Sequence, residues 1–136
     1  MKEEYATYEQ AIKLKELGFK DKCNAYYWTE DKAFECTNSI VHKNSDTCQT
    51  VVMAPSLWQA QKWLRDKGMF LMIDPRYYQG DAINNVKWCF IIQPLDDISG
   101  QYRSECYGRL FDSYESALSA GIEKALELLT DNQNGK

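Results

Sequence analysis

Residues 111–129, FDSYESALSAGIEKALELL, decide the fold because they predict an amphipathic helix at the end of a series of strands. The apolar residues of this stretch recur at helical spacing on one face, and its charges lie mostly on the other. We expect Asp112 to cap the helix and Gly121 to allow close packing on a sheet. The apolar face consists of Leu118, Gly121, Ile122, Ala125 and Leu129.

Three strand-like runs precede this helix, and another helix precedes the runs. Their sequences are MFLMID at 69–74, VKWCFIIQPL at 86–95 and YRSECYGRLF at 102–111. The earlier helix is predicted to have Pro55 in its first turn, a capping box at Ser56 and Gln59, and its end at Gly68. The order helix, three strands, helix predicts an α+β fold, with helices packed on an antiparallel sheet.

Both faces of the two strongest strand-like runs are apolar. In 86–95, for example, Trp88, Phe90 and Ile92 alternate with Cys89 and Ile91. A sheet covered by helices on one side only usually shows polar residues on its open side. We therefore expect the N-terminal segment of the chain, or a partner subunit, to cover the second face.

The N-terminal segment, residues 1–54, predicts a helix followed by aromatic strands. Thr7 and Gln10 have capping-box spacing at the start of a helix over 8–17, and Gly18 suits its C-terminal end. The strands are predicted at 25–29, 33–37 and 48–53, with a loop over 38–47.

The length of the chain favours a single domain. Its 136 residues are close to the commonest domain size. We expect one α+β domain over 1–130, in which the N-terminal segment 1–54 precedes the helix–three strands–helix unit 55–130. A flexible tail is expected over 131–136, where polar residues have nothing to bury.

Charge and composition restrict the partners. The chain has 16 basic and 20 acidic residues, a net charge of −4, and no basic cluster of the kind that binds phosphate backbones. We find no signal-peptide pattern and no apolar run of about 20 residues that could span a membrane. These features predict a cytoplasmic location, where the five cysteines would be reduced.

Three stretches carry a resemblance to a known family. They are YEQAIKLKELGF at 8–19, SLWQAQKWLRDK at 56–67 with the preceding Ala-Pro pair, and GRLFDSYESALSAGIEKALELL at 108–129. Together they resemble small hypothetical proteins encoded by phages and prophages of Bacteroides-type gut bacteria. The resemblance implies a small cytoplasmic accessory protein of unknown function, with no catalytic residues to transfer.

The order helix, three strands, helix is also similar in topology to a double-stranded RNA-binding domain. That family places lysines at the start of its last helix to contact phosphates. The matching positions here are Ser113, Tyr114, Glu115 and Ser116. An acid where a base is needed argues against RNA binding.

Cysteine and histidine offer two kinds of chemistry. Cys23, Cys36 and Cys48 flank His42, the only histidine, and the four residues could form a zinc site if they met in space. Cys36 or Cys48 could also form a nucleophile pair with His42. Metal sites usually have closely spaced ligand pairs, which this sequence lacks, so we expect no metal, no cofactor and ordinary thiols.

Other chemistry is weakly signalled. Asp96 and Asp97 could act as paired carboxylates, although adjacent acids in a turn usually carry solvated charge. No glycine-rich phosphate loop occurs in the sequence, and we predict no catalytic residues.

The segment 74–85 contains the candidate contact surface, the loop after Pro75. Its sequence, DPRYYQGDAINN, is long for a link between neighbouring strands and carries Arg76, Tyr77 and Tyr78 in succession. Arginine and tyrosine commonly anchor interfaces. The alternative is that the tyrosines pack on the edge of the core.

These observations predict a non-catalytic protein-binding or adaptor module, either a monomer or a homodimer. Two alternatives remain open: a nucleic-acid-binding module that reads shape, and a small Cys/His enzyme. Nucleic-acid binding would require five basic residues to gather on one face, namely Lys62, Arg65, Lys87, Arg103 and Arg109.

Overall fold

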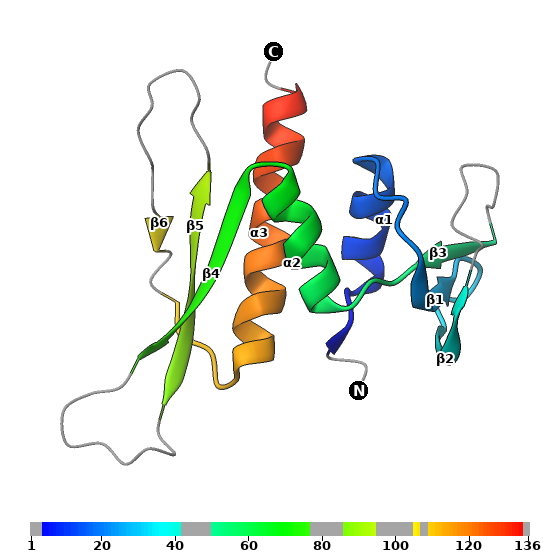
Figure 1. Ribbon diagram of the computed structural model, residues 1–136, viewed down its shortest axis with the longest axis horizontal. Coiled ribbons are helices and arrows are strands. Elements are labelled where there is room, and N and C mark those ends of the chain that lie inside the picture. Colours follow the sequence, from blue (N-terminus) through cyan, green and yellow to red (C-terminus); the bar gives the residue numbers. More distant parts are fainter. Residues whose placement is uncertain (1–3, 42–49, 77–85, 95–104, 107–108, 135–136) are drawn as a thin grey trace.

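The structure is a computed structural model, and it describes residues 4–41, 50–76, 86–94, 105–106 and 109–134. It contains helices and two antiparallel sheets, so the fold is α+β as the sequence predicts (Figure 1). In chain order the elements are α1 (Tyr8–Glu16), β1 (Cys23–Trp28), β2 (Phe34–Val41), β3 (Val51–Met53), α2 (Leu57–Asp66), β4 (Met69–Arg76), β5 (Lys87–Pro94), β6 (Glu105–Cys106) and α3 (Tyr114–Asn134).

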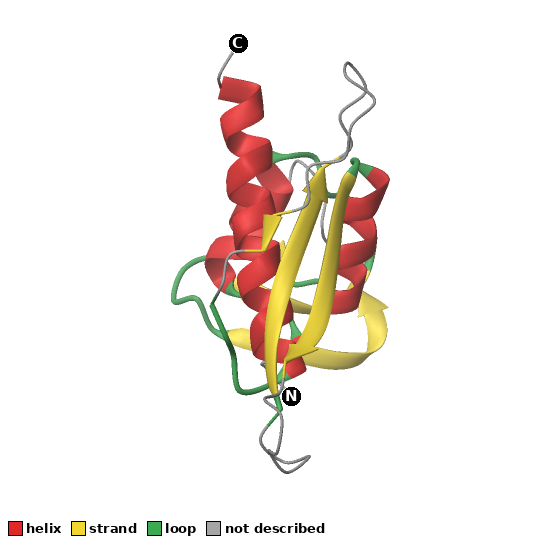
Figure 2. Cartoon of the chain, turned by 90° about the vertical axis from the view of Figure 1, so that its left-hand side faces the viewer, coloured by secondary structure: helices red, strands yellow, loops and turns green. Residues whose placement is uncertain are grey.

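The C-terminal portion of the chain has the predicted order of helix, three strands and helix. Its strands form an antiparallel sheet in the order β4-β5-β6. The ladder between β4 and β5 runs without interruption from Met69↔Pro94 to Arg76↔Lys87. Figure 2 shows these strands in front of α2 and α3, so both helices cover the same face of the sheet.

The core between this sheet and α3 is formed by apolar side chains of both. Phe90 and Ile92 of β5 are buried together with Leu118 and Ile122 of α3. A Cβ built on Gly121 would lie 2.5 Å from Leu71 Cδ1 and 3.1 Å from Phe90 Cβ. The absence of a side chain at this position therefore lets α3 lie directly on the sheet, as the sequence indicates.

The N-terminal segment forms a second antiparallel sheet, in the order β2-β1-β3, with α1 packed between β3 and α3. The predicted capping box is present: Thr7 Oγ1 accepts from Gln10 N, and Gln10 Oε1 accepts from Thr7 N. Gln10 Nε2 also donates to Ser119 O at 3.0 Å, which ties α1 to α3.

The prediction that the N-terminal segment covers the second face of the β4-β5-β6 sheet is wrong. Figure 1 shows α1 and the β2-β1-β3 sheet on the far side of α2 and α3, away from the open face of the β4-β5-β6 sheet. Met72, on that open face, is 41% exposed. Apolar residues on both faces of a strand indicate that both faces tend to be covered, but they do not identify the element that covers each face.

The predicted cap of α2 is confirmed, because the Ser56 side chain accepts from Gln59 N. The helix begins at Leu57, however, so Pro55 lies before it and not in its first turn. The start of α3 shifts by one residue from the prediction. Ser113, not Asp112, accepts from Ser116 N at the start of α3. Asp112 instead forms an ion pair with Lys87 of β5.

Several predicted ends also differ. β2 continues to Val41 into the expected loop 38–47, because residues as far as Val41 pair with β1. Within the last predicted strand, 102–111, the described residues Glu105–Cys106 form β6, and Phe111 forms an isolated bridge with Trp88. α3 extends to Asn134, so four residues of the expected tail 131–136 are helical. No helix in the described ranges is long and apolar enough to cross a membrane.

Candidate functional site

The described cysteines do not form a reactive centre. Burial raises the pKa of the Cys23 thiol to about 12, with a further contribution from Asp21, so this thiol stays protonated at neutral pH. Cys89 is buried, and its Sγ accepts from Arg76 Nε at 3.3 Å. Cys36 is exposed, with Tyr5 Oη 3.4 Å from its Sγ. His42 and Cys48 lie outside the described residues.

Cys23 and Cys36 therefore have different surroundings, and a pair between Cys36 and His42 stays a prediction. Among the described residues, no three His, Cys, Asp or Glu side chains gather as a metal-ligand group. The pair Asp96 and Asp97 lies outside the described residues.

One of the three predicted contact residues lies in a strand. Arg76 is the last residue of β4, paired with Lys87, and is therefore not in a loop. Its Nη2 lies 3.4 Å from Asp74 Oδ2. Tyr77 and Tyr78 lie outside the described residues, so their role as contact residues stays a prediction.

The basic residues that nucleic-acid binding would need lie on different elements. Lys62 and Arg65 lie on α2, Lys87 on β5, and Arg109 just before the bridge at Phe111. Lys62 forms an ion pair with Asp66 at 3.2 Å, and Lys87 with Asp112. Arg103 lies outside the described residues.

The lysine contact on Asp112 has an electrostatic consequence. The hydrogen bond from Lys87, together with its charge, lowers the pKa of the Asp112 carboxyl from its usual value of 3.8. Each charge is balanced by the other, which reduces the attraction of Lys87 for a phosphate.

The outer edge of β4 is the first of two notable surfaces. In the order β4-β5-β6, no other strand of the described residues pairs with this edge. Leu71 O accepts from Gln61 Nε2 at 2.9 Å and therefore points away from β5. On the other side of β5, Trp88 N donates to Phe111 O, and Trp88 O accepts from Phe111 N. The backbone groups of Trp88 therefore point away from β4. Since backbone direction alternates along a strand, this agrees with an outward direction at Leu71.

It follows that the odd-numbered residues of β4 direct their backbone groups outward. The N–H and C=O of Ile73 are among them, and Pro75 is at the next outward position. Proline at this position leaves the β4–β5 ladder intact, because its missing N–H would have faced outward. This is why β4 continues through Pro75 to Arg76, where the sequence predicts an end.

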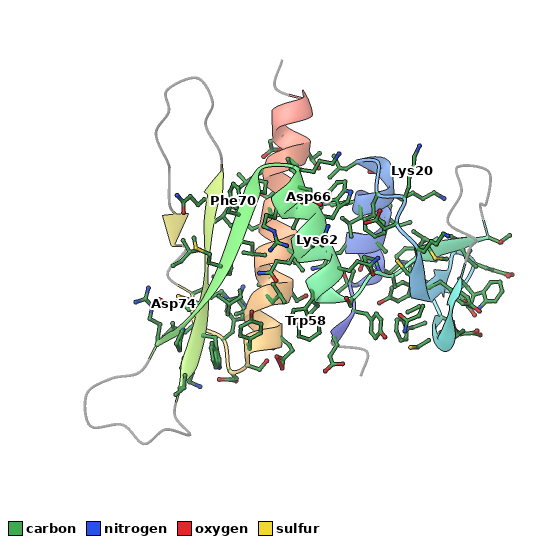
Figure 3. All side chains as sticks on the ribbon, in the orientation of Figure 1. Lys20, Trp58, Lys62, Asp66, Phe70 and Asp74 are labelled. Carbon is green, nitrogen blue, oxygen red and sulfur yellow. The ribbon has the colours of Figure 1, made fainter. Side chains whose placement is uncertain are left out.

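A groove accompanies this edge. Its volume is about 410 Å³, and it is lined by Gln61, Arg65, Phe70, Leu71, Met72 and Gln93. We call it the α2–β4 groove. Figure 3 shows Trp58, Lys62 and Asp66 one after another along α2, and Phe70 and Asp74 on β4.

Two large apolar side chains of α2 and β4 are exposed, and one of them, Met72, lines the groove. Trp58 on α2 is 45% exposed, and Met72 on β4 is 41% exposed. Arg65 is exposed and has no ion-pair partner among the described residues. Within the described residues, the groove thus combines a strand edge with which no other strand pairs, apolar surface and a cationic side chain, and these are groups that can bind an extended peptide.

The second surface is a cleft of about 910 Å³ where α1, the β1–β2 turn and the first half of α3 meet. Its two cations already contact its own rings: Lys32 Nζ lies 5.1 Å from the centre of the Tyr8 ring, and Arg109 Cζ 5.0 Å from that of Phe111. Three carboxylates and several hydroxyl groups complete a lining of mixed character: Glu9, Glu115, Glu123, Thr7, Ser113, Ser116 and Ser119. This mixture favours no single chemical class of ligand.

Sequence reasoning identified neither surface. The groove depends on which strand lies at the edge of the sheet and which helix lies beside it, and both are set by contacts between distant segments. One local signal was present, since Pro75 inside a strand run indicates an edge strand.

Comparison with known proteins gives no relative: no family model, no curated protein and no solved structure matches this chain.

Proposed function

We propose that the protein is a non-catalytic protein-binding module that uses the outer edge of β4 and the α2–β4 groove. The observation that carries the proposal is the edge itself: no strand of the described residues pairs with it, and the exposed side chain of Met72 lies in the groove beside it. Natural proteins usually protect such edges, because an exposed edge pairs readily with another chain. An edge that is flanked by exposed apolar side chains fits a binding surface.

Other features of the described residues support binding over catalysis. Cys23 and Cys89 are buried, and burial holds the pKa of the Cys23 thiol well above neutral. Lys62 and Lys87 are paired with aspartates, which weakens the case for a phosphate-binding surface. The resemblance to phage and prophage proteins stays a prediction, and it would make the partner a phage or host protein.

Site-specific photo-crosslinking tests the proposal. A photoreactive phenylalanine in place of Met72 should form a discrete adduct in a lysate of the cells that encode the protein. The matched control carries the same group in place of Asp131, an exposed residue of α3. Equal adduct patterns from the two positions, or no adduct from position 72, would contradict the proposal.

A further inference from the structure

We propose that the α2–β4 groove takes an extended segment of a partner protein, with alternating acidic and apolar residues, which adds to β4 as a further strand. This inference rests on the proposed function and specifies the partner's chemistry. Its three supports are the hydrogen bonds that the edge offers, the charge beside it, and the space available there.

The backbone groups of the edge are suited to one added strand. Ile73 offers both its N–H and its C=O, Leu71 offers its N–H, and Pro75 offers its C=O. The Leu71 carbonyl already accepts from Gln61. An added strand can therefore form two hydrogen bonds with Ile73 and one each with Leu71 and Pro75. This pattern defines where the strand binds.

Side chains of an added strand would alternate between two environments. Those on the helix side would contact α2 near Gln61 and Arg65, and those on the open side would lie beside Phe70 and Met72. Arg65 has no ion-pair partner among the described residues. Acidic residues facing α2 and apolar residues facing Met72 suit these two environments. The partner segment should therefore alternate acidic and apolar residues along its sequence.

The space beside β4 favours a single segment over a second copy of this chain. The side chain of Gln61 reaches the Leu71 carbonyl, so α2 runs alongside the outer edge. If β4 paired with β4 of a second copy in one continuous sheet, the two α2 helices would lie on the same side of it. Each would then occupy the space that the other copy needs.

A defined peptide provides the probe. We would use a fluorescent eight-residue peptide of alternating valine and glutamate, and one of alternating valine and lysine as its control. Fluorescence anisotropy at low salt measures both affinities. We expect the glutamate peptide to bind at least about tenfold more tightly, because opposite charges across a site favour association.

Matched variants test the strand geometry. Ile73→Pro removes the outward N–H, whereas Ile73→Ala also shortens the side chain but keeps the N–H. We expect the proline variant to bind the glutamate peptide about tenfold more weakly than the alanine variant, as for one lost hydrogen bond. Arg65→Glu should weaken binding, and the matched control Arg109→Glu, which changes a cleft residue, should not.

A second measurement covers the case in which Ile73→Pro does not fold. In the unaltered protein, saturation with the glutamate peptide should slow hydrogen exchange at the Ile73 amide more than at the Met72 amide, which already pairs with β5.

Each contrary result has a distinct meaning. Equal binding by the proline and alanine variants would overturn strand addition, although an adduct at position 72 would still support the proposed function. If both peptides bind equally well, or if neither binds, the proposal of an acidic partner segment is wrong. A dimer in sedimentation that Ile73→Pro dissociates and Ile73→Ala does not would make a second copy the occupant and overturn the proposal.

Discussion

Gly121→Ala is the sharpest test of how α3 lies on the sheet. A methyl group at this position would lie 2.5 Å from Leu71 Cδ1 and 3.1 Å from both Cβ and Cγ of Phe90. The Leu71 contact is with the end of a side chain, which can rotate. The Phe90 contacts are near the backbone of β5, so the helix itself has to move.

Two opposing effects set the magnitude. Alanine is favoured over glycine inside a helix by about 1 kcal/mol. Overpacking of a dense core costs about 1–3 kcal/mol. Since three contacts are tighter than ordinary van der Waals separation, we expect overpacking to win, with a net loss of about 1 kcal/mol.

Denaturant unfolding of a double-mutant cycle with Leu71→Ala separates the two effects. Removing Cδ1 of Leu71 relieves the shortest contact, so Gly121→Ala should cost less in the Leu71→Ala background than in the unaltered protein. We expect a coupling of about 1 kcal/mol or more between the two sites. If Gly121→Ala stabilises the unaltered protein by about 1 kcal/mol, the full helix-propensity gain, α3 does not lie on β4 and β5 as described.

Three further predictions concern individual side chains. Tyr27→Phe should destabilise the fold by about 1–2 kcal/mol in thermal unfolding, because the buried Tyr27 hydroxyl donates to Ala6 O at 2.7 Å; an unchanged melting temperature would refute this bond. Of the thiols that the structure describes, only Cys36 should react with iodoacetamide at pH 8, since the others are buried; mass spectrometry identifies the site, and rapid labelling of a buried thiol would contradict the packing. The pKa of Asp112 should lie below 3.8 in an NMR titration and should rise in Lys87→Met. The stability that the ion pair provides should be present above pH 3.8 and lost as the pH falls through the folded pKa. An Asp112 pKa that is the same in both proteins would exclude the pair.

Local signals in the sequence were sufficient for much of the fold. The capping box at Thr7 and Gln10 forms within four residues, and its prediction is confirmed. The close approach at Gly121 is likewise confirmed, since a glycine in the middle of an apolar helix face usually marks a place where another element comes near the helix backbone. Both features depend on neighbours in the chain or on one residue's shape.

Features set by distant segments were harder to predict. Apolar alternation in β4 and β5 indicated a cover for both faces, but the side on which α1 and its sheet pack is decided by contacts across the whole chain. Arg76 was assigned to a loop because proline usually ends a strand. At an outward edge position, however, Pro75 leaves the β4–β5 ladder unbroken, and Arg76 remains in β4.

The open edge of β4 is the central claim, and amide hydrogen exchange in the free protein tests it most directly. The amides of Phe70, Met72 and Asp74 face β5 and should be protected, whereas those of Leu71 and Ile73 face outward and should exchange much faster. An alternating pattern along β4 is the result that we predict. Equal, strong protection of Leu71 and Ile73 in the free protein would show that another segment already covers the edge, and would contradict the binding surface proposed for it.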